Sequence, residues 1–331
     1  MTGNEDTSLA LRDALAGRRG ASLSPALEPL VEDARTYARN ARAERTVAAY
    51  RAQWRHFSDW CARHALAALP ASPEAVVLYL TARAREGRKV ATLAQALTAI
   101  SQAHVRAGHG SPRMHPAVRE TFLGIQRMHG SPPTQKEPLL IAELQRVVGT
   151  LGDDTSGLRD RALLLVGFAG AFRRSELCAL SIDDVRFVAD GLTIVLRRSK
   201  TDQEGRGRTI AVPRGAAALT CPVRTLEAWL QRAAIVAGPV FRSVDRHGNV
   251  GGALRGGDVA CIIKRRVRGA GLDPATYSGH SLRAGLVTSA AKAGKRAHVI
   301  MKTTGHRSVA MVHRYIRDAE LFTDNAAGGL L

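Results

Sequence analysis

The chain has 331 residues, of which 45% are hydrophobic, so it is long and apolar enough to fold into two domains that each bury a core. Lysine and arginine outnumber aspartate and glutamate by 48 to 29, and the resulting net charge of +19 predicts a polyanionic partner. Part of this excess could instead come from a generally arginine-rich composition. A disordered chain is excluded.

Several kinds of site and segment are missing from the sequence. Its four cysteines form no C-x-x-C pair, and it contains no phosphate-binding loop, dinucleotide-binding motif or zinc-protease motif. We therefore expect no metal, no cofactor and a reducing cytoplasmic location. The first residues are polar and acidic, where a signal peptide would be basic and then apolar. The longest apolar run, residues 162–172, is too short to cross a bilayer, so we expect a buried helix and no membrane association.

Residues 1–28 are predicted to form a flexible leader, and residues 29–129 a wholly helical domain. Within this domain, apolar residues between positions 47 and 61 recur at steps of three and four, which indicates one helix with a single buried face. Its aromatic residues are therefore expected in the core rather than stacked on bases. The basic stretch 83–89 could bind phosphates, or it could be a solvated helix face.

Three helix starts are marked in this domain. Ser72 followed by proline and glutamate predicts a capped start, and Thr92-x-x-Gln95 is a capping-box pattern. Another helix is expected to begin near Arg45 and Thr46. Because backbone N–H groups at a helix start are free to bind anions, Arg45, Thr46, Thr92 and Gln95 are candidates for phosphate contacts.

A linker and a second domain follow. Residues 130–138 are proline-rich and have no apolar periodicity, so we expect a linker there and a second domain over residues 139–317. This domain is predicted to be mostly helical, with a small antiparallel sheet. Alternating apolar residues and turn signals predict three strands, at residues 185–187, 192–196 and 209–212. Two of the later helices are expected at residues 226–234 and 259–267.

Four short motifs in the second domain carry polar residues of the kinds used in catalysis. The first contains Arg173 and Glu176, which are three apart and so share a helix face, whereas Arg174 points elsewhere. Taken alone, this pair could be a structural ion pair. The second contains His280 and Arg283, again three apart on one helix face. A histidine near a helix start could also be no more than a polar cap.

The other two motifs contribute a lysine, a histidine and a tyrosine. Lys200 ends a predicted strand and enters a hairpin, where lysines are common for other reasons. His306 follows a glycine in a predicted turn, and Ser308 is the expected N-cap of a helix that carries Tyr315. His313 lies two residues before Tyr315 and so faces away from it on a helix. We therefore expect His313 to be a surface residue.

Taken together, Arg-x-Ser-Glu-Leu, the hairpin lysine, His-x-x-Arg, Gly-His and the closing tyrosine resemble the tyrosine recombinase (phage integrase) family. The resemblance covers about residues 30–317. It implies a mainly α fold, with a helical core-binding (SAM-like) domain over 29–129 and a mostly α catalytic domain with a small antiparallel β-sheet over 139–317. The family's catalytic set falls on Arg173, Lys200, His280, Arg283, His306 and Tyr315.

The resemblance implies that Tyr315 attacks a DNA phosphate and forms a 3′-phosphotyrosyl intermediate. Two guanidinium groups suit the charge that spreads over the phosphate oxygens. A tyrosine hydroxyl ordinarily keeps its proton up to about pH 10, so a neighbouring base is needed, and we expect His280 in that role. Lys200 is expected to protonate the departing 5′ oxygen, and His306 to donate a hydrogen bond to the phosphate. Exchanging one ester for another conserves the bond's energy, so neither ATP nor metal is required.

The resemblance also implies the partners. We expect double-stranded DNA, bound by both domains, and a homotetramer on paired recombination sites, with residues 318–331 packing as a tail on a neighbouring subunit. Two alternatives stay open. A type IB topoisomerase would use similar chemistry but act alone, and a DNA-binding or architectural protein could carry the same residues without activity.

Overall fold

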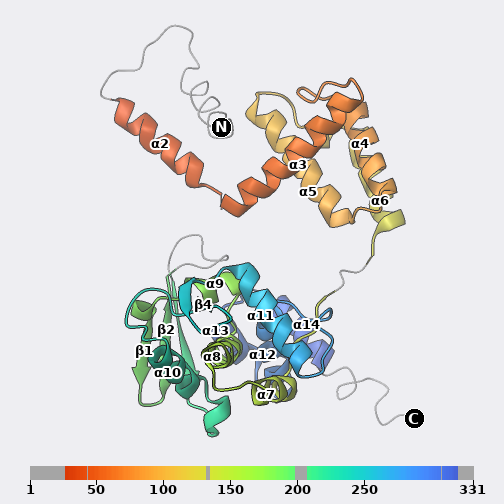
Figure 1. Cartoon of the computed structure of the whole chain (residues 1–331). Helices are drawn as coiled ribbons and strands as arrows, with labels where there is room; N and C mark the ends of the chain where they lie inside the picture. Colours follow the sequence, from red (N-terminus) through yellow and green to blue (C-terminus); the bar gives the residue numbers. More distant parts are fainter. Residues whose placement is uncertain (1–26, 43, 132–134, 198–206, 307, 320–331) are drawn as a thin grey trace, which may run out of the picture. The chain divides into compact units, whose positions relative to one another are not determined.

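A computed structural model describes residues 27–319, except residues 43, 132–134, 198–206 and 307 and the side chains of residues 39, 314 and 316–319. The chain divides into two compact units, residues 1–133 and 134–331 (Figure 1). Each unit has a hydrophobic core of its own. Residues 1–26 of the expected leader and most of the expected tail lie outside the described residues, and α2 already begins at Glu28.

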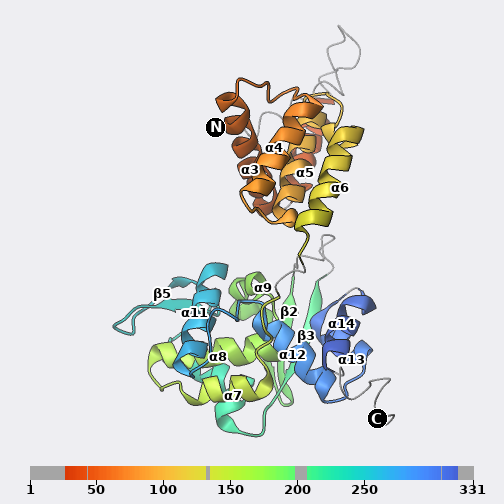
Figure 2. The ribbon, with the colours of Figure 1, turned by 90° about the vertical axis from the view of Figure 1, so that its right-hand side faces the viewer.

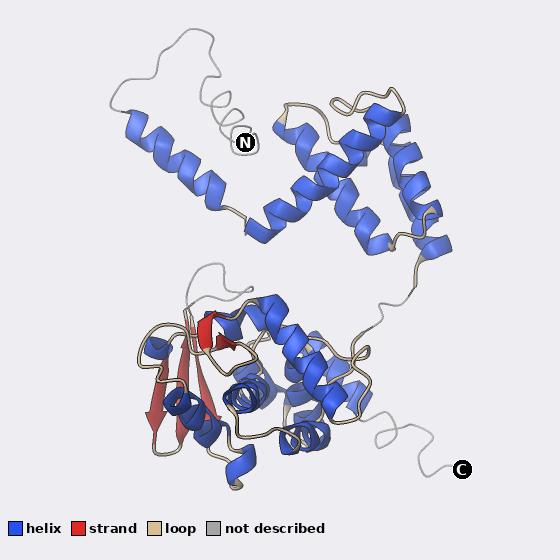
Figure 3. Cartoon of the chain, viewed as in Figure 1, coloured by secondary structure: helices blue, strands red, loops and turns tan. Residues whose placement is uncertain are grey.

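The first unit is built from helices where it is described (Figure 3). They are α2 (Glu28–Asn40), α3 (Glu44–Arg63), α4 (Pro73–Arg85), α5 (Val90–Arg106) and α6 (Pro116–His129), with a 3₁₀ turn at Pro112–Met114. Helix α3 packs against α5, and α4 against α6 (Figure 2). The predicted apolar face of α3 is confirmed, because Phe57, Trp60 and Cys61 are buried against Tyr79 of α4.

One of the helix starts predicted from capping patterns is confirmed and another is wrong. The hydroxyl of Ser72 accepts a hydrogen bond from the backbone N–H of Ala75 and caps α4. Thr92 does not begin a helix, because α5 starts two residues earlier. The backbone N–H of Thr92 already donates to the carbonyl of Lys89 at 2.8 Å. The pattern with Gln95 is therefore internal to α5.

The basic stretch in the first unit is partly structural. Arg83 is only 6% exposed, and its guanidinium lies 2.6 Å from the carboxylate of Glu86. Arg88 reaches the same carboxylate at 3.6 Å. Arg85 is exposed. A phosphate-binding role is thus confined to the exposed members of the stretch, and Arg83 serves to fix the end of α4.

The second unit combines helices with two small sheets. Its first half contains α7 (Ile141–Gly149), α8 (Thr155–Ala169), α9 (Arg174–Ala179), β1 (Val185–Val188), β2 (Gly191–Leu196), β3 (Arg208–Pro213) and α10 (Pro222–Arg232), with 3₁₀ turns at Ile182–Asp184 and Ala218–Thr220. Its second half contains β4 (Arg242–Val244), β5 (Val250–Ala253), α11 (Gly256–Gly269), α12 (Ser281–Lys292), α13 (Ala297–Thr304) and α14 (Val309–Ala319).

The three predicted strands are confirmed as one antiparallel sheet in the order β1-β2-β3. Its register sets Ile194 of β2 opposite Val185 of β1 and Ile210 of β3. The β4–β5 hairpin was not predicted from the sequence. Both strands are short, and adjacent glycines in β5 dilute the apolar alternation that marks a strand.

Helix α8 runs through the core of the second unit, as its apolar run predicts. Most of its residues are buried, and α10 packs along it. The helix ends at Ala169, three residues before the predicted end, because Ala171 adopts a left-handed φ of 49° that no helix continues. No helix in the described part of the chain is long and apolar enough to cross a bilayer.

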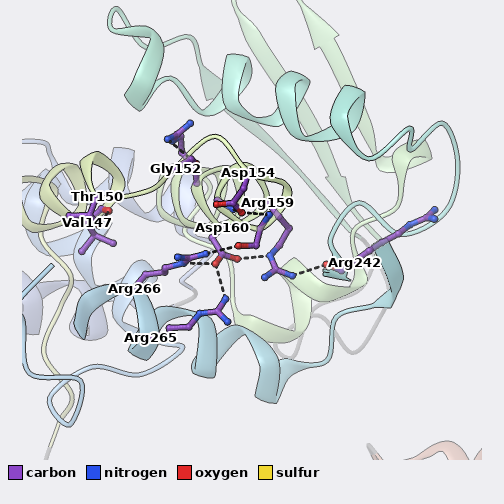
Figure 4. A network of polar contacts seen from close by, with 12 residues as sticks. Val147, Thr150, Gly152, Asp154, Arg159, Asp160, Arg242, Arg265 and Arg266 are labelled. Atoms are coloured by element: carbon purple, nitrogen blue, oxygen red, sulfur yellow. Dashed lines mark hydrogen bonds and ion pairs between the residues drawn. The ribbon is translucent and has the colours of Figure 1, made fainter. Parts of the chain in front are cut away.

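A buried carboxylate ties α8 to its neighbours (Figure 4). Asp160 of α8 is 0% exposed and accepts from Arg159 at 2.5 Å, on one carboxylate oxygen. Its other oxygen accepts from Arg265 at 3.0 Å and Arg266 at 2.6 Å, both on α11. Arg159 also donates to the carbonyl of Arg242 in β4. This network fixes α11 and the β4–β5 hairpin on the helix that leads to the candidate site.

Candidate active site

The turn after α8 places the first arginine. Arg173 is extended and immediately precedes α9, and its Nη1 donates to Oε1 of Glu176 at 2.5 Å. The backbone N–H of Arg173 donates to the other oxygen, Oε2, at 2.9 Å. Contact between Arg173 and Glu176 is as expected, although Arg173 caps the helix rather than lying on its face. Because the Glu176 side chain is 2% exposed, it holds the guanidinium in one orientation.

Arg283 of α12 supplies the second arginine. It is 1% exposed, and its Nη1 donates to the carbonyl of Ala171 at 2.7 Å. Its Nη2 is buried without a hydrogen-bond partner among the described residues. Burial, together with the nearby charges of Arg173 and Arg208, lowers the pKa of Arg283 to about 10. The carboxylate of Glu176 opposes this shift in the pKa of Arg283.

A third arginine, Arg208, was missed in the sequence. It is the first residue of β3, and its Nη1 donates to the carbonyl of Thr303 in α13 at 2.7 Å. Its Nη2 lies 3.8 Å from Oε2 of Glu176. The signal was present in the strand, because Ile210 and Val212 point to the core at steps of two and Arg208 shares their register. An arginine on the core-facing side of a strand needs a buried hydrogen-bond or ion-pair partner.

The Gly-His turn brings His306 to the arginines. Gly305 ends α13 with a left-handed φ of 67°, which glycine adopts without strain, and His306 behind it is buried. Nδ1 of His306 lies 2.8 Å from the hydroxyl of Thr304, which also lies 2.8 Å from the carbonyl of Ile300. A hydroxyl has one proton, so while Thr304 donates to Ile300, Nδ1 of His306 donates to Thr304. The neutral ring then presents Nε2 as an acceptor.

The environment keeps His306 neutral. Burial and the positive charges of Arg283 and Arg173 lower its pKa to about 4. The ring of Tyr315 in α14 lies close by, with the two ring centroids 6.5 Å apart. Tyr315 is half-buried and packs against a small apolar cluster of Val287, Ala291, Ile300 and Val312. The expected surface position of His313 is confirmed, because that side chain is exposed.

His280 is the residue before α12 and is exposed. Partial removal of the ring from water lowers the pKa of His280, and the charges of Arg283, Arg173 and Arg174 lower it further. Arg174 points away from Glu176, as expected, and its Nη1 lies 3.5 Å from the carbonyl of Gly256 in α11. Its side chain crosses Gly279, where an added Cβ would lie 1.8 Å from Cδ of Arg174. Glycine at that position therefore lets Arg174 lie beside His280.

The remaining predicted residues are Lys200 and four residues of the first unit. Lys200 lies outside the described residues, between the end of β2 and the start of β3 in the sequence. Arg45 and Thr46 are exposed in the first turn of α3. Thr92 is half-buried and Gln95 exposed, both within α5, so their backbone N–H groups do not form a helix start. These four residues belong to the first unit.

The cluster is cationic. Arg173 and Arg208 face the carboxylate of Glu176, Arg283 lies near enough for that carboxylate to affect its pKa, and two histidines with lowered pKa values lie beside the arginines. Such a site suits a phosphate group. Within the described ranges, no group of three or more histidine, cysteine, aspartate or glutamate side chains could hold a metal ion. The fold and this cluster of residues thus define a mainly α protein whose site is lined by arginines and includes a tyrosine.

The sequence of the chain is similar to those of known proteins. Residues 138–321 match the phage integrase family. An integrase/recombinase XerD homolog of Selenomonas ruminantium is 42% identical over 291 residues, which cover 86% of this chain and 85% of that protein. Tyrosine recombinase XerC of Syntrophus aciditrophicus is 29% identical over 177 residues, covering 49% of this chain and 50% of that protein. The chain therefore belongs to the phage integrase family, the tyrosine recombinases.

Solved structures agree on the fold. The XerH site-specific recombinase bound to its palindromic difH substrate matches with a TM-score of 0.64 at 14% identity, covering 99% of this chain and 96% of that one. A lambda integrase dimer bound to a COC′ core site matches with a TM-score of 0.56 at 16% identity, covering 93% of this chain and 84% of that one. The expected fold class, helical units with a small antiparallel sheet, is confirmed.

Proposed function

We propose that the chain is a site-specific DNA recombinase or integrase that breaks and rejoins DNA through Tyr315. The observation that carries this proposal is that Arg283 and Arg173 lie near one another, with His306 and Tyr315 beside them. Arg283 is buried and its Nη2 lacks a hydrogen-bond partner among the described residues. Leaving such a group unpaired costs about 1–3 kcal/mol or more, and an oxygen of the scissile phosphate would supply the partner.

Arg173 and Arg283 bind the phosphate in this mechanism. Glu176 orients Arg173, and the carbonyl of Ala171 orients Arg283, so both guanidiniums are in place before DNA arrives. As Tyr315 attacks, negative charge grows on the phosphate oxygens. Fixed positive groups stabilise that charge without having to reorganise, and this preorganisation lowers the barrier.

Each bond made is matched by a bond broken. The hydroxyl oxygen of Tyr315 bonds to phosphorus, and the bond to the 5′ oxygen breaks, which leaves a 3′-phosphotyrosyl ester. His280 accepts the tyrosine proton, and a lowered pKa keeps it in the neutral form that can do so. Lys200 gives a proton to the departing oxygen. Rejoining reverses these steps, so neither ATP nor a metal ion is consumed or needed.

His306 contacts the phosphate in its second tautomer. In the arrangement described, Nδ1 donates to Thr304, so Nε2 cannot donate to an oxygen. If the hydroxyl of Thr304 turns to donate to Nδ1, the proton moves to Nε2 and faces the phosphate. Thr304 thus selects between an accepting and a donating His306 without the ring having to move.

Double-stranded DNA is the proposed partner, and the first unit serves as a core-binding domain with phosphate contacts from Arg45 and Thr46. We further propose a homotetramer on two sites, with residues 318–331 docking on a neighbouring subunit. The net charge of +19 and the DNA-bound relatives support the first of these statements. The second is what the resemblance to the tyrosine recombinase family implies.

Paired-site recombination tests the proposal against its rivals. A binding duplex is selected from a random library with the purified full chain and placed twice on a supercoiled plasmid. We expect deletion or inversion between the two copies, and no rearrangement with one copy. Relaxation of supercoils that needs no paired sites would instead identify a type IB topoisomerase. Binding without any strand breakage, covalent adduct or rearrangement would identify an architectural protein.

A further inference from the structure

Arg208 joins three elements of the candidate site. It extends from β3, donates to the carbonyl of Thr303 in α13, and faces the carboxylate of Glu176 in α9. Its guanidinium also packs against Gly305, where an added Cβ would lie 2.7 Å from Nη1 of Arg208. The turn that carries His306 therefore packs against the Arg208 side chain. The same side chain faces Glu176, which is the partner of Arg173.

We propose that Arg208 is a positioning residue for strand cleavage, which holds the His306 turn and the Glu176 carboxylate in one fixed arrangement. The proposal rests on the recombinase function proposed above. Arg208 acts through its neighbours, because its Nη1 donates to the carbonyl of Thr303 and its Nη2 lies 3.8 Å from the carboxylate of Glu176. A lysine could not replace it, since one ammonium cannot both donate to Thr303 and face Glu176 from two separate nitrogens.

The surroundings of Arg208 differ from those of an ordinary strand arginine. Arg214 follows the same strand, yet its side chain is 39% exposed and meets Glu227 at 3.8 Å on the surface. The Arg208 side chain is 20% exposed, and the Glu176 side chain that it faces is 2% exposed. Taking a guanidinium out of water is costly unless it is paired. Arg208 makes its contacts where Glu176 and the His306 turn meet.

Removing the charge of Arg208 has a second effect that can be measured without DNA. Arg208 is one of the groups that hold the pKa of His306 low, after burial, Arg283, Arg173 and His280. The pKa of His306 should therefore rise in Arg208→Met and remain low in Arg208→Lys. Spectra of the full chain with ¹³C-labelled histidine follow this titration, and His306→Gln identifies the signal.

The cleavage test uses Arg208→Met and Arg208→Lys, with Arg214→Met as the matched control. Single-turnover formation of the covalent adduct is measured on a nicked copy of the selected duplex. Displacing catalytic groups by an ångström can cost about 100-fold in rate. We expect a loss of that order in both Arg208 variants, with DNA affinity within about threefold of the wild type and no loss in Arg214→Met.

A pair of glycines tests the same contact from the other side. Gly305 and Gly294 both have left-handed φ angles, of 67° and 70°, but nothing lies within 4 Å of an added Cβ at Gly294. Alanine at either position strains the backbone alike, and only Gly305→Ala also displaces Arg208. We therefore expect Gly305→Ala to cleave far more slowly than Gly294→Ala.

The outcomes are decisive in each case. If Arg208→Met does not fold, Arg208→Lys and the glycine pair carry the test. Wild-type cleavage rates in Arg208→Lys and in Gly305→Ala would overturn the proposal. If the wild-type chain itself forms no adduct, the recombinase function fails, while the histidine titration still reports whether Arg208 lies beside His306.

Discussion

Replacing Asp160 by asparagine should destabilise the second unit strongly. The carboxylate is 0% exposed and contacts three arginines, of which Arg159 is 4%, Arg266 21% and Arg265 59% exposed at the side chain. Arg265 can return to water, but Arg159 stays buried. Removing one partner of a buried ion pair costs about 3–5 kcal/mol, and the partial exposure of two of the arginines puts the expected loss near the lower end, about 3 kcal/mol.

Hydrogen exchange of the full chain measures this loss where it occurs. Peptides from α8 and α11 should lose protection equivalent to about 3 kcal/mol, a large part of a typical stability of about 5–15 kcal/mol. The control is Glu227→Gln, because Glu227 lies 3.8 Å from Arg214 and the two side chains are 37% and 39% exposed. That change should cost less than about 1 kcal/mol. Equal effects of the two substitutions would refute the reasoning.

Two further predictions follow from charge. The pKa of His306 is lowered from 6.5 to about 4 on folding, so the unfolded chain binds the proton first. Its contribution to stability is therefore complete above about pH 6.5 and is lost as the pH falls toward 4, and thermal melts of His306→Gln should lack this part of the pH dependence. Affinity for the selected duplex should fall steeply with salt, by about 0.9 logarithmic units per tenfold salt for each neutralised phosphate. A nearly flat salt response would contradict binding of a duplex by the whole chain.

Much of the fold could be predicted because its elements are local. The strands around Ile194 and Ile210 alternate with a period of two, and the apolar face of α3 recurs at helical spacing. The wrong start at Thr92 shows the limit of such patterns. A threonine followed three residues later by a glutamine fits a capping box. However, α5 has already begun before Thr92, because the backbone N–H of Thr92 donates to the carbonyl of Lys89.

The candidate site was predictable in its residues and not in its geometry. Arg173, Arg283, His306 and Tyr315 lie on short motifs that could be recognised, and the structure brings them together. Arg208 belongs to no such motif, and its contact with Glu176 joins residues far apart in the sequence. The tautomer of His306 depends on where the hydroxyl of Thr304 points, which spacing cannot show.

Mapping the covalent bond to DNA tests the central claim most directly. The full chain is incubated with a nicked copy of the selected duplex in excess chelator, and the trapped adduct is digested and sequenced by mass spectrometry. We predict a 3′-phosphotyrosyl bond at Tyr315, lost in Tyr315→Phe and retained in His313→Ala. Tyr277 is the internal comparison, since it is 2% exposed, its hydroxyl donates to Glu143, and burial raises its pKa to about 12. An adduct at Tyr277, or cleavage that stops with chelator and returns with magnesium, would contradict the account.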